Sequence, residues 1–305
     1  MFLSSWFKPV LERFAARTPV ADDCTPVLPR VPSVPATYKD ETADSHKARL
    51  LREIEVEHGI GTKPLALMRR EMSRLKDAEE RAHAPFHEVR YLMTYAITPP
   101  GPGVLVDIGS SPIYGKALQE LKNWDLRSVP VLAMDYEVDP LPFADETADG
   151  VLLCEVLEHF VVDPLHCLIE INRVLRHDGF IALTTPNACS WYAVYRALHH
   201  THPSRWPVYT LNPAIQRNHI HAREYVASEV AVLLEAAGFD RITITTRDYG
   251  ISPPFCPVDG FDTSNRGETI FCMARKAGPP RKRAVQPIYL EDVTFGSMPS
   301  RRGAS

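Results

Sequence analysis

The chain has 305 residues, of which 45% are hydrophobic and 24% charged, and its formal net charge at pH 7 is −4. This composition is ordinary for a folded globular protein, and the slight acidic excess gives no reason to expect nucleic acid as a partner. No apolar run approaches the roughly 20 residues that a membrane-spanning helix needs. The six cysteines are scattered without a Cys-x-x-Cys pair, so we expect reduced thiols and a cytoplasmic protein.

Residues 1–17 repeat apolar side chains at helical spacing, with the aromatic Phe2 and Trp6 on one face and Lys8 and Arg13 nearby. Such an amphipathic helix either docks on the protein's own body or on a partner, which we favour, or makes a peripheral contact at the inner face of a membrane. The proline-rich stretch that follows is predicted to be an extended linker. Residues 1–42 are therefore assigned to an N-terminal helix and linker.

Residues 43–98 are predicted to form a helical cap. Apolar side chains recur at helical spacing in three successive groups: Leu50, Leu51 and Ile54, then Leu65, Met68, Met72 and Leu75, and then Phe86, Val89, Leu92 and Tyr95. A proline- and glycine-rich turn at 99–103 then leads into the domain assigned to residues 99–276.

In that domain the predicted strands and helices alternate, which favours a doubly wound α/β fold with a mostly parallel sheet. An aromatic, histidine-rich insert at 188–220 lacks a clean period and is expected to line an acceptor site, and residues 277–305 are expected to be a flexible basic tail. The predicted elements are a strand at 104–108, a helix at 115–124, strands at 129–135 and 149–154, a helix from Asp163 to Gly179, a strand at 180–185, a helix at 226–237, and strands at 240–246 and 268–275.

The first predicted strand ends at the turn Asp107-Ile108-Gly109, just before a helix. Glycine lets the backbone approach a ligand closely, and the carboxyl ends of parallel strands open into the crevice where α/β proteins bind nucleotides. This single turn is a weak signal, because many unrelated proteins contain one. It gains force from three further blocks that follow it in order.

These blocks resemble class I S-adenosylmethionine-dependent methyltransferases, and most of all the type 11 group typified by ubiquinone-biosynthesis enzymes. The resemblance spans residues 104–276, and the second of its blocks is the most specific one. The blocks are Val106–Pro112, Asp139–Asp149 running into Glu155–Phe160, Glu170–Gly179 with Thr184–Asn187, and a weaker set formed by His221–Tyr225 and Leu233–Phe239.

The resemblance implies a Rossmann-like methyltransferase fold, S-adenosylmethionine as cofactor, and specific roles for residues at the strand ends. Asp107 would take the α-ammonium group of the cofactor. Gly109, with Ser110 and Ser111 in the same loop, would pass beneath its methionine and ribose portions. Glu155, after the fourth strand of the family pattern, would lie near the transferring methyl group.

The chain departs from the family pattern between Gly109 and Asp135. Only 135 − 109 = 26 residues separate them, enough for one helix and one strand where the family has two of each. We therefore expect a reduced second strand–helix unit. Alignment would place Asp135 at the adenine, whereas a single right-handed crossover would set its strand beside the first, so that Asp135 with Tyr136, or Glu137, serves the ribose.

Two histidines are candidate general bases. His159 lies four residues after Glu155, so on a helical turn the two would share a face, and a neutral imidazole near the sulfonium can accept a proton. His221, with His219 as its neighbour, is the rival, and His159 could instead only cap its turn. The histidines at 199, 200 and 202 lack a carboxylate or cysteine at ligand spacing, so no metal is expected.

The sequence therefore predicts methyl transfer from S-adenosylmethionine to an oxygen, with nitrogen as the second choice, of a small-molecule, sugar, glycan or lipid-linked acceptor. The alternative is a methyltransferase-like binding or scaffold protein whose cofactor loop has decayed. A nicotinamide oxidoreductase is disfavoured because no Gly-x-Gly-x-x-Gly follows the first strand. The sequence leaves the oligomeric state open.

Overall fold

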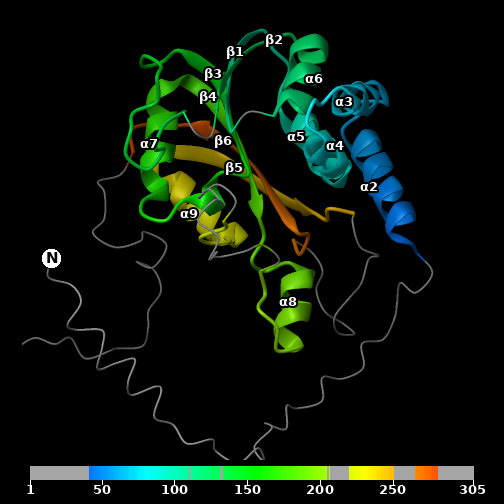
Figure 1. Ribbon diagram of the computed structural model, residues 1–305. Coiled ribbons are helices and arrows are strands. Elements are labelled where there is room, and N and C mark those ends of the chain that lie inside the picture. The colour runs from blue at the N-terminus through cyan, green and yellow to red at the C-terminus, as the bar shows by residue number, and fades with distance from the viewer. Residues whose placement is uncertain are drawn as a thin grey trace, which may run out of the picture. The chain divides into compact units, whose positions relative to one another are not determined.

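Figure 1 shows the computed structural model of the chain. The structure describes residues 41–109, 111–130, 133–204, 206, 220–250 and 265–280. The chain divides into two compact units, 1–33 and 34–305, and all described residues belong to the second. The amphipathic helix predicted at 1–17, most of the linker, and the tail beyond residue 280 lie outside the described residues.

The helical cap contains helices where the apolar spacing predicted them. It comprises α2 (Ala43–Glu57), α3 (Lys63–Ser73), the short α4 (Ala78–His83), the 3-10 helix η1 (Ala84–His87) and α5 (Glu88–Ile97). Thr42 begins α2, because its side chain accepts a hydrogen bond from the Ser45 amide at 3.2 Å. Leu51, Ile54 and Leu92 from these helices are buried together and pack on Phe271 of the sheet.

The sheet has six strands in the order β2-β1-β3-β4-β6-β5. Its first four strands run parallel, and β6 pairs antiparallel with both β4 and β5. This is the mostly parallel α/β sheet that the alternating elements predicted. The strands are β1 (Gly103–Ile108), β2 (Trp124–Val129), β3 (Ala148–Cys154), β4 (Leu175–Pro186), β5 (Phe239–Arg247) and β6 (Thr269–Lys276).

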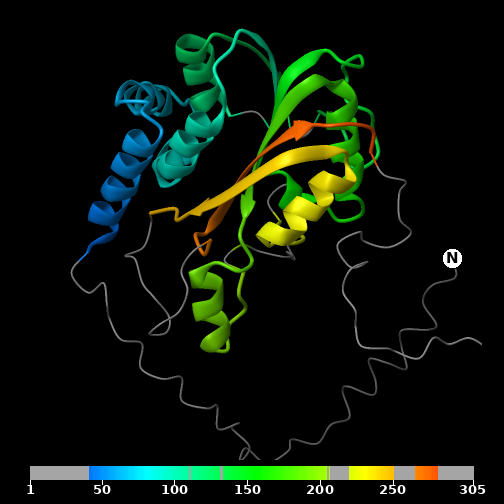
Figure 2. The ribbon, with the colours of Figure 1, turned by 180° about the vertical axis from the view of Figure 1, so that it is seen from behind.

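Helices cover both faces of the sheet (Figures 1 and 2). One face buries alternate strand residues such as Val106 and Leu153 against α7 (Pro164–Val174) and α9 (Ala227–Ala236). The opposite face buries their neighbours Leu105 and Leu152 against α6 (Pro112–Lys122), α3 and α5. Because both faces are apolar, the sheet is the centre of a doubly wound fold and its functional groups must lie at strand ends.

The region after β1 corrects two predicted elements. The helix predicted at 115–124 occupies Pro112–Lys122, and the strand predicted at 129–135 is Trp124–Val129. Asn123 adopts a left-handed conformation with φ 59°, which ends the helix two residues early. Pro130 follows β2 directly and has no amide hydrogen to continue the ladder.

The reduced strand–helix unit is confirmed. Strand β2 pairs parallel with β1, from Gly103 opposite Trp124 to Ile108 opposite Val129, as the single crossover required. In the described part of the connection between β2 and β3, no α-helix or further strand is found. β2 therefore forms one edge of the sheet.

Two later boundaries also differ from the sequence prediction. Helix α7 ends at Val174 rather than near Gly179, because Leu175 already pairs with Ala148 as the first residue of β4. The aperiodic insert contains a helix, α8 (Trp191–Leu198), which Ser190 begins by accepting a hydrogen bond from the Ala193 amide. Among the described residues, no helix is both long and apolar enough to span a bilayer.

Candidate functional site

Asp107 lies at the carboxyl end of β1 and is completely buried. Its two carboxylate oxygens accept hydrogen bonds from the Tyr114 hydroxyl and the Ser111 amide, each at 3.2 Å. Burial raises the pKa of Asp107 to about 7, although these two hydrogen bonds act in the opposite direction. The group can therefore ionise near neutral pH if a positive ligand arrives.

The loop after Asp107 has the turn that the sequence predicted. Gly109 has a φ of +96°, which favours glycine, and its amide donates to the Val129 carbonyl at 3.2 Å. Ser110 lies outside the described residues. The hydroxyl oxygen of Ser111 is buried without a hydrogen-bond partner in the described part of the chain, so the loop keeps a polar atom available next to Asp107.

Asp135 and its neighbours are not at the end of a strand, because β2 stops at Val129. The Asp135 side chain is exposed and accepts a hydrogen bond from the Glu137 amide at 3.1 Å. The Tyr136 ring packs in the core, with its hydroxyl 2.9 Å from the Pro130 carbonyl. The topological argument for a ribose contact at Asp135 was therefore wrong about the strand, and that contact stays a prediction.

Glu137, the alternative ribose acid, is engaged elsewhere. Its carboxylate accepts hydrogen bonds from the amides of Val162 and Asp163 at the start of α7. Asp163 in turn caps that helix by accepting from the amides of Leu165 and His166 at 3.1 Å. Glu137 thus tethers the connection between β2 and β3 to α7.

Glu155 follows β3 directly and has a φ of +56°, an unfavourable conformation for a residue with a side chain. Its carboxylate accepts hydrogen bonds from the hydroxyls of Thr184 at 2.9 Å and Tyr249 at 3.2 Å. A third partner is Arg90 of α5, whose guanidinium lies 3.8 Å away. Glu155 therefore joins the cap, β4 and the segment after β5 at one point.

Arg90 is a site residue that the sequence analysis missed. Its side chain is only 11% exposed, and its Nε has no hydrogen-bond partner among the described residues. Next to it, burial and then the charge of Arg90 lower the pKa of His87 to about 3. The available signal was an arginine inside the apolar run from Val89 to Leu92.

Glu155 and His159 do not share a helical face, in contrast to the prediction. The only helical turn here is η3 (Leu157–His159), which begins after Glu155. Glu155 turns toward Tyr249, whereas His159 Nδ1 lies 2.9 Å from the Ile220 carbonyl. The two candidate functional groups therefore belong to neighbouring but separate clusters.

Glu158, His159 and His221 form the second cluster. Their ligand atoms all lie within 4.8 Å of one another, and the His159 and His221 rings meet edge to face with centroids 4.9 Å apart. Burial, followed by the charge of Glu155, raises the pKa of Glu158 well above its ordinary value. Burial and then His159 lower the pKa of His221 to about 3, so His221 is neutral at physiological pH.

Sequence reasoning selected both histidines but missed Glu158 as their partner. It also missed the convergence, because Glu158 and His221 are far apart along the chain and no local spacing links them. The histidines of the insert lie apart from this cluster in the sequence. His199, His200 and His202 are exposed, and within the described residues they belong to no group with metal-ligand spacing.

Aromatic side chains border this cluster on the side of β4. Trp206, from the insert, has its ring centroid 5.3 Å from that of His221 and 6.4 Å from that of Tyr249. Trp206 and Tyr249 also line a small hollow at the end of β4, which includes Asn187, Ser190, Tyr192, Glu224 and Glu268. The site therefore has an aromatic wall with acidic groups beside it.

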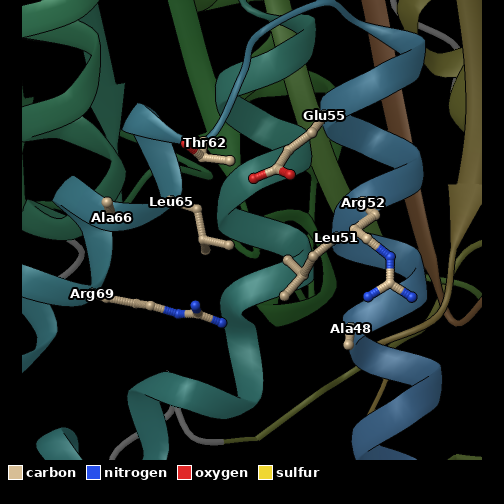
Figure 3. A pocket seen from close by; sticks show the side chains of 8 residues that line it. All are labelled: Ala48, Leu51, Arg52, Glu55, Thr62, Leu65, Ala66 and Arg69. Carbon is tan, nitrogen blue, oxygen red and sulfur yellow. The ribbon is translucent and has the colours of Figure 1, made fainter.

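A second hollow, of about 300 Å³, lies in the cap between α2 and α3 (Figure 3). Leu51 and Leu65 form part of its lining, and Arg52 and Arg69 stand at its rim. The Arg69 guanidinium donates to both carboxylate oxygens of Glu88, at 2.7 and 3.0 Å. This pairing holds α3 to α5, and the hollow shares no residue with the strand-end site.

Comparison with known proteins places this site in context. Residues 104–183 match the family model described as a methyltransferase domain. The matched segment begins in β1 and includes Asp107 and Gly109, as well as Glu155, Glu158 and His159 after β3. The comparison with curated proteins returns no match.

Three solved structures show similarity at low identity. A methyltransferase in complex with the Trm112 activator of Haloferax volcanii is 16% identical, with 69% of this chain and 98% of that chain covered and a TM-score of 0.46. A Thermotoga maritima S-adenosylmethionine-dependent methyltransferase is 17% identical, with 68% of this chain and 99% of that chain covered and a TM-score of 0.40. An S-adenosylmethionine-dependent methyltransferase from Archaeoglobus fulgidus is 14% identical, with 66% of this chain and 100% of that chain covered and a TM-score of 0.45.

The similarity to a family comes from the matched segment and from the residues within it. That segment contains the Asp-x-Gly turn after the first strand and the Glu-Val-Leu-Glu-His run after β3. Through residues 104–183, the chain is similar to the family described as a methyltransferase domain.

Proposed function

We propose that the chain transfers a methyl group from S-adenosylmethionine to a hydroxyl oxygen of a small molecule, sugar, glycan or lipid-linked acceptor, with nitrogen as the second choice. The proposal rests mainly on one observation, which is that Asp107 is buried at the end of β1 and is followed by a turn in which Gly109 has a left-handed conformation. A buried carboxylate beside a glycine turn suits the α-ammonium group of an amino-acid-containing nucleoside.

Buried polar atoms around the strand ends support this cofactor. Ser111 Oγ and Arg90 Nε have no hydrogen-bond partner among the described residues, and buried polar atoms are normally paired. The α-ammonium group of the cofactor would favour the ionised form of Asp107. The Arg90 guanidinium is suited to the cofactor's carboxylate. When bound, S-adenosylmethionine supplies an activated methyl group, so the chain has mainly to align the acceptor and exclude water.

The acceptor would lie against the aromatic wall formed by Trp206 and Tyr249. We propose His159 as the group that takes the acceptor proton, with His221 as the rival. Because the Ile220 carbonyl can only accept a hydrogen bond, His159 Nδ1 carries the hydrogen and its Nε2 carries the lone pair. Nε2 is therefore the atom that can receive a proton.

The test is calorimetric binding of S-adenosylhomocysteine to the full chain. We expect binding in the micromolar range, weakened at least tenfold by Asp107→Asn, which corresponds to about 1.4 kcal/mol. The matched control is Asp125→Asn on β2, whose exposed carboxylate pairs with Arg127 at 3.0 Å. Absence of binding to a well-folded wild-type chain, or equal binding by both variants, would contradict the proposed cofactor site.

One observation favours the second candidate, a methyltransferase-like binding or scaffold protein. The Tyr114 hydroxyl already occupies one oxygen of Asp107, and Gly109 is the only glycine in the loop before Gly115. Transfer of a labelled methyl group to any acceptor would remove this candidate. Tight binding of S-adenosylhomocysteine without transfer to a broad acceptor panel would support it.

We also retain the proposal that residues 1–17 make a peripheral membrane contact, which rests on their sequence pattern alone. Sedimentation with anionic vesicles should recover more of the full-length chain than of a chain lacking residues 1–17. Equal partitioning of the two chains would exclude a role for that segment.

A further inference from the structure

We propose that Glu158, His159 and His221 form a binding site for a divalent transition-metal cation. The three residues offer one carboxylate oxygen and two imidazole nitrogens, and these atoms all lie within 4.8 Å of one another. Two histidines and one carboxylate form a known ligand set for Zn²⁺, Fe²⁺, Co²⁺ and Mn²⁺, and three protein ligands leave coordination positions open.

The Glu158 side chain supplies an independent observation that points to a ligand. It is 0% exposed, and its Oε2 accepts a hydrogen bond from the buried Thr185 hydroxyl at 2.9 Å. This contact fixes the carboxylate, so that the other oxygen, Oε1, lies 3.9 Å from His159 Nε2. Oε1 has no hydrogen-bond partner in the described part of the chain, an arrangement that is costly unless something positive binds there.

The histidines are oriented as metal ligands usually are. His159 Nδ1 donates to the Ile220 carbonyl at 2.9 Å, which leaves the Nε2 lone pair directed toward Glu158. Metal-bound histidines commonly use the second ring nitrogen in this way, to fix the tautomer and the ring. The Nδ1 of His221 is also buried without a hydrogen-bond partner among the described residues, and the Glu224 carboxylate lies 4.0 Å from it.

The backbone holds the two parts of the site together. Glu158 and His159 lie on η3, and the Arg223 amide donates to the Glu158 carbonyl at 3.1 Å. Together with the hydrogen bond from His159 to the Ile220 carbonyl, this contact holds the backbone on both sides of His221 beside η3. Ligand atoms around a tetrahedral ion stand about 3.4 Å apart for bonds of about 2.1 Å, so side-chain movements of about 1 Å would close the site.

Glu155 is not a ligand in this proposal, although it belongs to the same Glu-Val-Leu-Glu-His run. Both of its carboxylate oxygens are occupied by hydroxyls, from Thr184 and Tyr249, and Arg90 stands beside it. The Glu155 carboxylate therefore has partners of its own outside the Glu158 cluster. The proposed cation site depends on one carboxylate, and its removal should be decisive.

A cation here would border the aromatic wall through Trp206, whose ring centroid is 5.3 Å from that of His221. An acceptor hydroxyl on an open coordination position would lose its proton to solvent more readily. With the cation bound, the Nε2 lone pair of His159 would be a metal ligand, and His159 would not act as the base. Its oxygen would then bond to the methyl carbon as the carbon–sulfur bond breaks and the electron pair goes to sulfur. This consequence rests on the proposed methyl transfer, whereas cation binding itself does not.

The test is titration of a tag-free, chelator-treated full chain with Co²⁺, followed by visible absorption and by competition with Zn²⁺. We expect one equivalent of Co²⁺ to give ligand-field bands that Zn²⁺ removes. Glu158→Gln keeps the shape and the Thr185 contact but loses the charge, and His221→Asn removes an imidazole. Both should weaken Co²⁺ binding at least tenfold while circular dichroism stays unchanged.

The matched controls are His177→Asn, whose side chain is 82% exposed, and His199→Asn in the histidine-rich loop. Both should bind Co²⁺ as the wild type does. No saturable Co²⁺ binding by the wild-type chain would overturn the proposal, and so would equal binding by Glu158→Gln and His221→Asn. Binding lost only in His199→Asn would place the cation in the loop and would also overturn it. Cobalt binding is measured without cofactor, so its failure is separate from failure of the S-adenosylhomocysteine test.

Discussion

The site contains two fully buried carboxyl groups, Asp107 after β1 and Glu158 after β3, and their surroundings differ. Both oxygens of Asp107 have hydrogen-bond partners, a hydroxyl and a backbone amide. Among the described residues the Glu158 carboxylate has one hydrogen-bond partner, the Thr185 hydroxyl, and its Oε1 faces two histidines. A ligand at Asp107 must therefore share or displace an existing contact, whereas Oε1 of Glu158 can gain one without doing so.

Burial alone therefore does not show whether a carboxyl group binds a ligand. Burial raises the pKa of both carboxyls, but the free oxygen of Glu158 marks a position for a positive ligand. At Asp107 the ligand competes with the Tyr114 hydroxyl.

The largest expected effect is the pH dependence of Asp107. Its pKa rises from 3.8 to about 7 on folding, so the folded chain favours the protonated form. The contribution of Asp107 to stability is therefore complete below pH 3.8 and is lost as the pH rises toward 7. Asp107→Asn does not titrate, so relative to wild type it should gain about 1.4 kcal/mol per pH unit across this window.

Urea unfolding of the cofactor-free wild type and Asp107→Asn at several pH values measures this. Asp125→Asn, with its exposed carboxylate, should show no such trend. A constant difference between Asp107→Asn and wild type from pH 4 to pH 7 would mean that Asp107 ionises freely in the folded chain.

The next effect concerns the pair of Arg90 and Glu155, which lie 3.8 Å apart. Glu155→Ala should destabilise the chain by about 3 kcal/mol, because it leaves the largely buried Arg90 without its carboxylate and removes two hydroxyl contacts. The double variant Glu155→Ala/Arg90→Met should recover part of this loss, since no unpaired charge remains. Glu235→Ala on the exposed side of α9 is the control, with an expected change within about 0.5 kcal/mol.

Chemical denaturation at a single pH decides this prediction. If the double variant is no more stable than Glu155→Ala, the ion pair has no role, and Glu155 acts only through its hydrogen bonds to Thr184 and Tyr249.

The smallest effect is expected from Tyr114→Phe. The change removes one hydrogen bond to Asp107 and should cost about 1 kcal/mol of stability. Because the lost hydroxyl competes for the same oxygen, the affinity for S-adenosylhomocysteine should be kept or increased. A large loss of affinity would show instead that the hydroxyl itself holds the cofactor.

Much of the fold could be predicted from the sequence, because it follows from local patterns. Apolar spacing located the cap helices, and the short distance from Gly109 to Asp135 revealed the reduced unit at the edge of the sheet. The position of β2 was missed because Asn123 ends the helix by a left-handed conformation that apolar periodicity does not report. Helix α8 was missed for a similar reason, since a capping serine starts it within an aperiodic segment.

The candidate site was predicted only where it is local. Asp107 could be placed at a strand end and Gly109 in its turn because strand, turn and helix are consecutive. Arg90 and Tyr249 were missed because contacts between the cap, β3 and the segment after β5 join residues distant in sequence. The convergence of His221 on Glu158 is likewise a product of the fold.

The most direct test of the cofactor site is a crystal structure of the full chain with S-adenosylhomocysteine. The ligand's α-ammonium group should lie within hydrogen-bond distance of Asp107, directly or through one water, with its backbone over Gly109 and Tyr114 moved from the carboxylate or sharing it. A ligand bound away from the end of β1, with the Tyr114–Asp107 contact intact and the space beside Gly109 filled by a side chain, would contradict the account.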